Sequence, residues 1–576
     1  MPPKRRPAGE EDDDPRKRHQ SAAATSNGNG HAPARTAATS KPGAVRGTPK
    51  PGVRKGNATT LANRAKLGAA AGSAVKKEAP PPVITKNTLM WFRSDLRIHD
   101  NRALYAASAR AKIGESKSLI CLYIISEQEW AHHDDAPVKI DFWFRNLAKL
   151  KKALDKLNIP LVVKNAGTKD DVAGLLESAV KEYDVSHVFW NAEYMVDEKR
   201  RDVAVKKALT KIPGVYVEEH EDQCIIPPKE MKTKVGNNFT SFIQFFAAWC
   251  HIVETNAYLL QASPMPEANA AEARQIYAKL FEATVRSSHT HSLDRKEIEN
   301  LYPAGEEAAQ TRLLSFIHDE INQYHVGREN LEDQGWMSVI PYLSNGIISA
   351  RQCVSLARES NNNKIIVGSK GVRAWIKEFA WREFYKGMLV SFPKLSMSRP
   401  YLPFTDNIRW SNDDRKFQMW CQGKTGYPIV DAGMRQLNTT GFMNNHVRMT
   451  VACFLVKDLL INWQKGEKYF MNNLVDGDLA TNNGGWQWCA STGADAQPYY
   501  RVFNPVAQSK KLDPVGEYIR HWVPELKTLP DSQIHDPYHS LSAKDFGKLG
   551  YPKPIVDHAE AKKKYTEEYK RVVPQS

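Results

Sequence analysis

The sequence predicts two folded domains, an α/β domain with a parallel β-sheet followed by a mostly α-helical domain. Over residues 87–220, short apolar runs alternate with helix-like stretches, which is the pattern of βαβ units. Beyond about residue 306, longer segments with 3.6-residue periodicity replace the short runs. The length of 576 residues, with 41% hydrophobic and 25% charged residues, suits about two to four soluble globular domains.

Residues 1–86 are predicted to be a disordered basic tail. They nearly lack large apolar side chains, so they cannot bury enough area to offset the entropy of ordering. With 17 Lys/Arg and 6 Asp/Glu, they carry most of the chain's net charge of +15. Basic clusters at residues 4–6 and 16–18 flank an acidic spacer and resemble a bipartite nuclear import signal. A merely solubilising or DNA-attracting tail is the alternative. We expect a nuclear protein and leave a mitochondrial fraction open, although the early acidic run disfavours a presequence.

The α/β domain is expected over residues 87–220. Strands are predicted at residues 89–92, 119–125, 161–163, 185–190 and 215–217, and helices at residues 138–157, 169–183 and 198–209. Parallel sheets bind ligands at the carboxyl ends of their strands. No GxGxxG motif follows the first strand, so a dinucleotide site in this domain is not supported.

A proline-containing connector is expected over residues 221–305, and a helical domain over residues 306–576. Periodic segments at 308–324, 372–390 and 443–464 predict long helices there. Seven cysteines without a CxxC pair favour a reduced intracellular protein. No run approaches about 18 apolar residues, so no membrane span is expected, and the polar N-terminus does not resemble a secretory leader.

The segment from Asp476 to Trp488 is the most unusual part of the helical half. It reads DGDLATNNGGWQW, with two carboxylates, three side-chain amides and three glycines. We judge it too polar and too rich in glycine for a core segment. It predicts a backbone that approaches a ligand closely, with polar groups around that ligand.

Several long motifs resemble the photolyase/cryptochrome flavoproteins, and most closely the class I cyclobutane pyrimidine dimer photolyases. They are WFRSDLRIHDNRAL (91–104), WIKEFAWREFY (375–385), GKTGYPIVDAGMRQL (423–437), FLVKDLLINW (454–463) and the segment 476–505. The resemblance implies a Rossmann-like α/β antenna domain and a helical C-terminal domain that binds FAD and DNA. It also implies electron transfer from excited reduced FAD to a pyrimidine dimer flipped out of damaged DNA.

The resemblance carries FAD-binding roles to one set of residues: Tyr324, Trp375, Arg382, Arg448, Asp476, Gly477, Asp478 and Asn482. Asn482 would lie opposite flavin N5. The loop expected to bind the flavin phosphates comprises Trp336, Met337, Ser338, Val339 and Ile340. This loop departs from the family's pattern because the hydroxyl positions become Trp336, Met337 and Ile340. Backbone amides can still bind phosphate.

The resemblance also assigns electron transfer, catalysis and DNA binding. Trp410, Trp463 and Trp486 match the family's three-tryptophan electron chain. Glu378, Asn445 and Met449 match catalytic contacts to the dimer, and burial would hold Glu378 protonated as a hydrogen-bond donor. Arg328, Trp381, Trp488, Arg501 and Gln508 match contacts to DNA or to the lesion.

The stretch around Met449 distinguishes lesion classes. Relatives that repair (6-4) photoproducts carry histidines where this chain has Asn444, Asn445 and Met449, so (6-4) repair is disfavoured. His446 stands where class I enzymes usually carry an arginine that binds phosphate, and it would donate more weakly at neutral pH.

His133, Asp197 and Glu198 match antenna-binding positions, which favours methenyltetrahydrofolate; a deazaflavin or an empty site stays open. No metal is expected, and the chain is expected to be a monomer that binds damaged DNA. A cryptochrome-type blue-light photoreceptor is the alternative function. The retained Glu378 and Met449 and the short C-terminal end favour repair.

Overall fold

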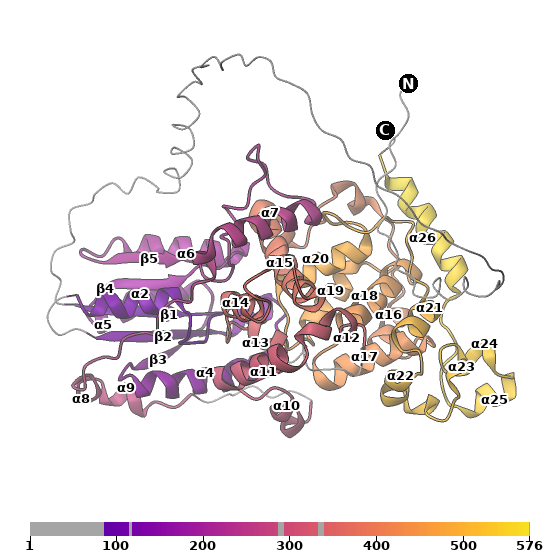
Figure 1. Ribbon diagram of the computed structural model, residues 1–576, viewed down its shortest axis with the longest axis horizontal. Coiled ribbons are helices and arrows are strands. Elements are labelled where there is room, and N and C mark those ends of the chain that lie inside the picture. The colour runs from indigo at the N-terminus through magenta and orange to yellow at the C-terminus, as the bar shows by residue number, and fades with distance from the viewer. Residues whose placement is uncertain (1–85, 114–117, 286–292, 332–338, 575–576) are drawn as a thin grey trace, which may run out of the picture. The chain divides into compact units, whose positions relative to one another are not determined.

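The computed structural model describes residues 86–113, 118–285, 293–331 and 339–574, which belong to one compact unit. Figure 1 shows a sheet-containing part and a helical part. Residues 1–85 of the predicted tail lie outside the described residues. The predicted parallel sheet is confirmed: β1 (Asn87–Phe92), β2 (Leu119–Ser126), β3 (Leu161–Ala166), β4 (Val185–Asn191) and β5 (Tyr216–His220) are all parallel, in the order β3-β2-β1-β4-β5.

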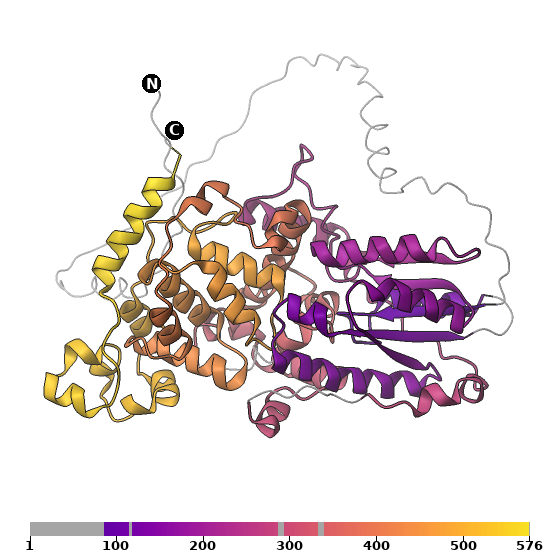
Figure 2. The same cartoon turned by 180° about the vertical axis from the view of Figure 1, so that it is seen from behind.

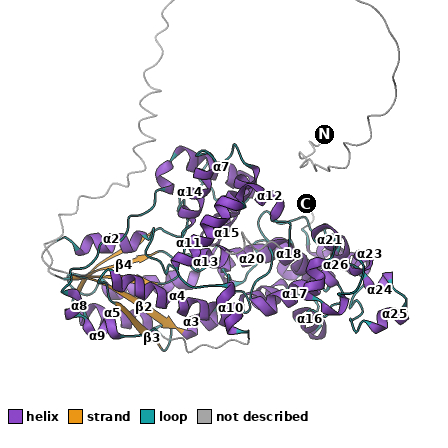
Figure 3. Ribbon diagram, turned by 60° about the horizontal axis from the view of Figure 1, so that its bottom comes forward, coloured by secondary structure: helices purple, strands orange, loops and turns teal. Residues whose placement is uncertain are grey.

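Both faces of the central strand β1 are buried, and its alternate side chains point to opposite faces of the sheet. In β1, Leu89 and Trp91 pack into the core that contains α5 (Asp171–Glu182) and α6 (Val196–Leu209). The next residues, Met90 and Phe92, pack into the core that contains α2 (Arg102–Ala111) and α4 (Pro137–Lys156). The strands therefore form one layer between helices, as Figure 3 shows.

The strand order creates a cleft at one edge of the sheet. Because β1 lies between β2 and β4, the connections from β1 and β4 leave in opposite directions at their carboxyl ends, and such a switch point is where α/β sheets hold ligands. The β1 connection is fixed to the helical part by Arg351, which pairs with Asp100 at 2.9 Å and with Asp222 at 2.6 Å. Gly346 (φ +67°) allows close approach, because a Cβ there would lie 2.0 Å from the Ser94 carbonyl oxygen.

The remaining elements are helical. After β2 comes α3 (Glu127–His132), and the predicted connector contains α7 (Phe242–Thr255), η2 (Ala257–Leu260), α8 (Ala273–Ile276), α9 (Ala278–Glu282) and α10 (Arg295–Leu301). The helical part begins with α11 (Glu306–Asp319), η3 (Ile321–Gln323), α12 (Tyr324–Gly327), α13 (Ile340–Ser344), α14 (Ala350–Ser360), α15 (Lys370–Ser391), η5 (Pro393–Met397), η6 (Pro403–Asn407), α16 (Asp414–Cys421) and α17 (Pro428–Thr440). It continues with α18 (Asn445–Cys453), η7 (Phe454–Asp458), α19 (Trp463–Met471), α20 (Leu479–Ala490), α21 (Pro505–Leu512), α22 (Glu517–Trp522), η8 (Pro524–Leu526), α23 (Asp531–Ile534), α24 (Pro537–Ser540), α25 (Ala543–Lys548) and α26 (His558–Val572).

The C-terminal helix α26, yellow in Figure 2, is fixed to the helical part by several hydrogen bonds. The Tyr569 hydroxyl donates to the Ser491 carbonyl at 2.6 Å, and His558 pairs with the buried Asp458 at 2.6 Å. Among the described helices, none is both long and apolar enough to cross a membrane.

Two predicted long helices are wrong in detail. The segment 308–324 is helical only to Asp319 and continues as the short turns η3 and α12. The segment 443–464 is broken, because α18 passes into a π-helical turn and Leu460 adopts a left-handed conformation (φ +55°) before α19 begins. Burial is continuous across this break, so hydrophobic periodicity does not reveal it.

The polar segment 476–488 forms most of α20, and our expectation that it is too polar for the core is wrong. Asn483 and Gln487 are buried because their amides pair internally: Asn483 donates to Glu467 at 2.7 Å, and Gln487 donates to Asn483 at 2.9 Å. Gly484 brings α20 close to α15, since a Cβ there would lie 2.2 Å from the Tyr385 ring.

Candidate functional site

A cavity of about 440 Å³ lies within the helical part, between α12, α13, α15, α18 and α20. Its volume falls in the range of small-molecule sites. Most residues predicted to contact FAD or the lesion line it: Tyr324, Arg328, Val339, Ile340, Trp375, Glu378, Trp381, Arg382, Asn445, Arg448, Met449, Asp476, Asp478 and Trp488. Positions spread over about 165 residues of sequence are thus brought to one cavity.

Arg448 and Asp476 form the fixed charged pair of this cavity. The Arg448 Nη2 lies 2.9 and 3.1 Å from the two Asp476 oxygens, and its Nε donates to the Met443 carbonyl at 2.8 Å. The guanidinium also lies 4.9 Å from the centre of the Phe442 ring. These contacts hold one cation and one anion side by side at the cavity wall.

Asp478 joins the cavity to the sheet-containing part. It caps α20 by accepting from the Thr481 amide at 3.0 Å, and it pairs with Lys386 at 2.9 Å. Burial alone would raise the pKa of Asp478, but Lys386 and Arg382 outweigh it and hold that pKa well below its usual range. Arg382 donates to the Gln223 carbonyl of the connector at 2.7 Å.

Asn482 does not line the cavity, although its neighbours Thr481 and Gly485 do. Its Nδ2 donates to the Glu467 backbone carbonyl at 3.0 Å, which leaves Oδ1 as the side-chain atom available to accept. The Glu467 side chain is buried, and burial raises its pKa to about 7.

An aromatic wall closes one side of the cavity. Trp375 is buried against Phe379, with ring centres 4.7 Å apart. Trp381 is partly buried, and the ring of Phe242 from the connector lies parallel to it at 3.4 Å. Trp488, on α20, provides a second partly buried indole. Flat apolar surfaces of this kind suit stacked rings.

Glu378 and Arg328 face each other in the cavity. Arg328 Nη1 donates to Glu378 Oε1 at 3.2 Å, and the two side chains are 33% and 37% exposed. Burial raises the pKa of Glu378, while Arg328 and Lys377 oppose that shift. The predicted acid is therefore placed in the cavity, but with a cationic partner that the sequence did not indicate.

The three predicted electron-transfer tryptophans differ in burial. Trp486 and Trp463 are buried, whereas Trp410 is half-buried. Trp486 packs at right angles against Phe470, with ring centres 4.9 Å apart, and lies 6.2 Å from Trp420. Trp420, which we did not single out, is thus a direct aromatic neighbour of Trp486.

Some predicted residues lie elsewhere. Trp336, Met337 and Ser338 fall outside the described residues. Gly477 lines the second cavity described below rather than this one. Arg501 is exposed and Gln508 is half-buried on α21, and neither lines the cavity.

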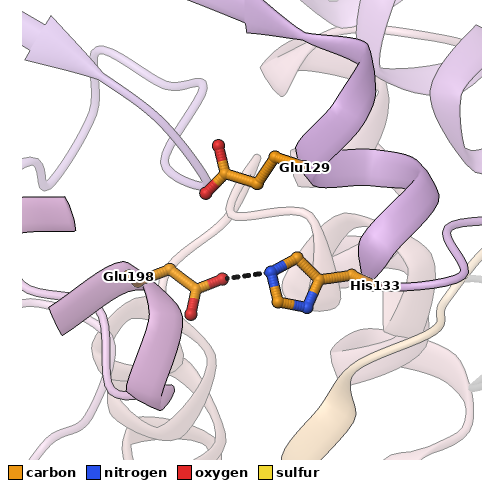
Figure 4. Close-up of side chains that lie close together, drawn as sticks. All are labelled: Glu129, His133 and Glu198. Atoms are coloured by element: carbon orange, nitrogen blue, oxygen red, sulfur yellow. Dashed lines mark ion pairs between the residues drawn. The ribbon is translucent and has the colours of Figure 1, made fainter. Parts of the chain in front are cut away.

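A second cavity lies at the carboxyl edge of the sheet, where the fold creates its cleft. His133 and Glu198 face each other there, with Nε2 and Oε1 3.0 Å apart (Figure 4). Burial lowers the pKa of His133, but the hydrogen bond and charge of Glu198 outweigh it and raise that pKa to about 9. Arg93, which belongs to the motif at 91–104, also lines this cavity, as do Glu193 and Arg201; no role was predicted for these three residues.

Asp197, the third predicted antenna residue, does not line the second cavity. It lies 3.1 Å from His132 and 3.5 Å from Arg200 instead. Glu129 lies beside His133 and Glu198 instead. One ring nitrogen of His133 and one carboxylate oxygen from each glutamate lie within 4.8 Å of one another. Glu129 is already paired with Arg201 at 2.7 Å, so the cluster has the composition of an ion-pair network.

Residues that the sequence analysis missed share one feature, since each gains its role only from a neighbour distant in sequence. They are Phe242, Lys386, Trp420 and Glu467. No local motif distinguishes them from ordinary surface or core residues.

Comparisons with known proteins agree with this architecture. A family model described as DNA photolyase matches residues 88–268, and one described as the FAD binding domain of DNA photolyase matches residues 375–571. The chain is 39% identical to the deoxyribodipyrimidine photo-lyase of Neurospora crassa over 516 residues, covering 87% of this chain and 83% of that protein.

Solved structures extend the similarity to the fold. A class III photolyase from Agrobacterium tumefaciens matches with a TM-score of 0.70 at 31% identity, covering 87% of this chain and 99% of that one. A Synechocystis cryptochrome matches with a TM-score of 0.71 at 25% identity, covering 84% and 99%. The chain therefore belongs to the DNA photolyase family and carries its FAD-binding domain.

Proposed function

We propose that this protein splits cyclobutane pyrimidine dimers in damaged DNA when it absorbs light. One observation carries the proposal. A single cavity combines the pair Arg448–Asp476 with Glu378 and the indoles of Trp381 and Trp488. Positions that match flavin contacts thus adjoin positions that match dimer contacts.

The cavity suits FAD by its chemistry. Trp375 and Phe442 provide apolar walls for a flat ring, while Arg448 and Asp476 offer a donor and an acceptor for its polar edge. Lys386 and Arg382 add positive charge toward the sheet-containing part. When bound and reduced, FAD supplies the light-excited electron that splits the dimer and takes it back afterwards.

The protein's own residues position the lesion and stabilise charge. Trp381 and Trp488 supply the apolar surfaces against which a flipped-out dimer packs, which requires that the dimer leave the duplex. Glu378, when protonated, donates a hydrogen bond to a pyrimidine carbonyl. Arg448 would stabilise the negative charge of a reduced flavin bound in the cavity. Asn445 and Met449, whose Nδ2 and Sδ lie 4.0 Å apart, complete the lesion side.

Two features favour dimer repair over (6-4) repair. Asn444 caps α18 by accepting from the His446 amide at 2.8 Å and is fully buried, so it is committed to structure. Asn445 and Met449 carry no titratable proton. His446 is the one histidine of this stretch, and burial lowers its pKa, which disfavours the charged form.

A cryptochrome-type photoreceptor is the alternative function, because the fold is shared with a cryptochrome. The retained Glu378, Trp381, Met449 and Trp488 favour repair, since a pure photoreceptor does not need lesion contacts.

We further propose an antenna chromophore in the second cavity, with methenyltetrahydrofolate as the favoured group. Glu198 and His133 support this, because a buried carboxylate paired with a histidine can accept from the N–H groups of a pterin-like ring. Asp197, paired elsewhere, is not part of the proposal.

Cellular placement and domain division follow from the sequence. The basic clusters at residues 4–6 and 16–18 favour nuclear import.

We propose an antenna domain over residues 87–220, a connector over 221–305 and a catalytic domain from 306 onward, in a protein that acts as a monomer. Connector residues Gln223 and Phe242 contact α15, which supports a connector that packs against the proposed catalytic domain.

Lesion binding tests the proposed cavity. A stacked base contributes about 1–3 kcal/mol, so Trp381→Ala should lower affinity for dimer-containing DNA roughly 5- to 150-fold. Affinity for undamaged DNA should change little, because that affinity comes from phosphate contacts. Equal loss for both DNAs would contradict the flipped-dimer pocket.

A further inference from the structure

We propose that Arg328 is shared between Glu378 and a DNA phosphate, so that lesion binding moves this guanidinium and draws one proton onto Glu378. Arg328 is then a positioning residue that acts through Glu378. The inference rests on the proposed function, since it concerns the lesion-bound state of the same cavity.

The first support is the geometry of the pair. Arg328 follows α12 directly and reaches Glu378 on α15 through one contact, from Nη1 to Oε1 at 3.2 Å. Its Nε is buried without a hydrogen-bond partner among the described residues. A single contact between two partly exposed side chains is weak and is easily exchanged for another anion.

The second support is the contrast with Arg448, which lines the same cavity. Arg448 makes three hydrogen bonds, two to Asp476 and one to a backbone carbonyl, so its position is fixed. A third arginine of the cavity, Arg382, donates to the Gln223 carbonyl at 2.7 Å. Among the hydrogen bonds that hold these three side chains in the described part of the chain, the one from Arg328 to Glu378 is the longest, at 3.2 Å, so Arg328 is the most easily displaced. A phosphate accepts well from guanidinium groups and competes directly for Arg328.

The third support is the balance of charge around Glu378. Cations face it from two elements, Arg328 beside α12 and Lys377 on α15, while Tyr324 and Tyr385 are the neighbouring hydroxyl groups. His446 on α18 lies near Arg328. Burial raises the pKa of Glu378 and the two cations lower it. Moving Arg328 away and excluding water with a lesion therefore both favour the protonated acid.

Protonation at this point serves the reaction. A carboxylate would repel a pyrimidine that gains negative charge, whereas a carboxylic acid donates a hydrogen bond to it. Transfer of Arg328 from Glu378 to a phosphate would couple binding of the DNA backbone to protonation of Glu378. This coupling would operate only when the lesion occupies the cavity. Linkage then requires that lesion affinity fall as pH rises, by up to about tenfold per pH unit while one proton is taken up.

Calorimetry in the dark tests the exchange. FAD-loaded protein is titrated with a dimer-containing oligonucleotide in buffers of different ionisation enthalpy, which reports protons taken up per lesion bound. We expect uptake approaching one proton for the wild type near neutral pH. We expect almost none for Glu378→Gln, whose amide cannot titrate, and a flat pH profile of affinity for that variant.

Two further variants separate Arg328 from other groups. Arg328→Gln should also reduce uptake, because Glu378 then lacks its cationic partner before binding. Lys511, an exposed residue paired with Glu329 at 3.4 Å, is the matched control. Lys511→Gln removes a neighbouring cation without touching Glu378 and should leave proton uptake unchanged.

Three results would overturn the inference. They are tight lesion binding without proton uptake in the wild type, undiminished uptake in Glu378→Gln, and uptake that disappears in His446→Asn instead. Absence of lesion binding at every pH would overturn the proposed function itself, so the two failures are distinguishable. Bound FAD, measured by absorbance, verifies that each variant is folded.

Discussion

The ring of Phe242 lies parallel to the indole of Trp381, with centres 3.4 Å apart and planes inclined by 6°. Phe242 begins α7 in the connector, and its amide donates to Asp495 Oδ2 at 2.8 Å. Lys377 lies 5.8 Å from the same ring. The buried ring of Phe242 thus supports the indole of Trp381, which we assign to the lesion pocket.

We expect Phe242→Leu to weaken lesion binding. An aromatic pair contributes about 0.5–1.5 kcal/mol beyond its buried area, so the affinity for dimer-containing DNA should fall roughly 2- to 12-fold. Phe242→Tyr keeps the ring and should retain affinity. Fluorescence anisotropy with damaged and undamaged oligonucleotides measures both. An unchanged ratio of the two affinities in the leucine variant would show that Trp381 does not need this support.

Trp486→Phe should block light-driven reduction of bound flavin. The indole oxidises readily and the phenyl ring does not, so an electron cannot pass from Trp463 and Trp410 through this position. Flavin absorbance under illumination with an external electron donor reports the loss. Chemically reduced Trp486→Phe protein should still repair dimers, because the chain is then bypassed.

Trp522→Phe is the control for that experiment, since Trp522 is only half-buried and lies on α22. It should photoreduce normally. Full photoreduction in the Trp486 variant would refute the role assigned to Trp486. It would show that electrons reach the flavin by a route that does not include this residue.

The sequence predicts the frame of the molecule well, because buried strands and amphipathic helices leave clear patterns. All five strands of the sheet lie where the apolar runs predict them. The break between α18 and α19 escapes prediction, since both sides of Leu460 are equally apolar. The α20 segment misleads for the opposite reason, because its amides are buried in pairs that only the folded chain supplies.

The site shows the same division. The motif at 375–385 singles out Glu378 and Trp381, and both residues line one cavity. Motifs do not reveal that Arg328 pairs with Glu378, or that Asp197 turns away from the second cavity, since each outcome depends on residues distant in sequence. Side-chain partners are properties of the packed structure rather than of the local pattern.

Glu467→Gln should stabilise the protein above neutral pH. Burial raises the pKa of Glu467 to about 7 from an ordinary value of 4.5. The folded state therefore holds this proton more tightly than the unfolded state, and the associated stability is lost as pH rises from 4.5 through 7. The full shift corresponds to at most about 3 kcal/mol.

Thermal midpoints at pH 5 and pH 8 measure this effect. The glutamine variant can still accept from Asn483 and should gain most at pH 8. A wild-type midpoint that rises between those pH values relative to the variant would mean that Glu467 is ionised in the folded protein and well paired.

Neutralising the six basic residues at positions 4–6 and 16–18 should move a fluorescent fusion out of the nucleus. Import receptors recognise such clusters by their positive charge. Imaging the full-length fusion beside the unaltered protein measures the change. Unaltered nuclear accumulation would show that these clusters do not direct import.

Light-dependent repair of a single defined lesion is the decisive test of whether this protein splits cyclobutane dimers. FAD-loaded, chemically reduced protein is mixed with an oligonucleotide containing one cyclobutane dimer, and with a matched oligonucleotide containing one (6-4) photoproduct. Restored pyrimidines are then quantified in the dark and under blue light. We expect restoration of the cyclobutane dimer only, and only in the light, and we expect Glu378→Ala to lower the yield per absorbed photon more than the affinity. Reduced, lesion-bound protein that restores no dimer under light would rule out dimer repair and favour a photoreceptor.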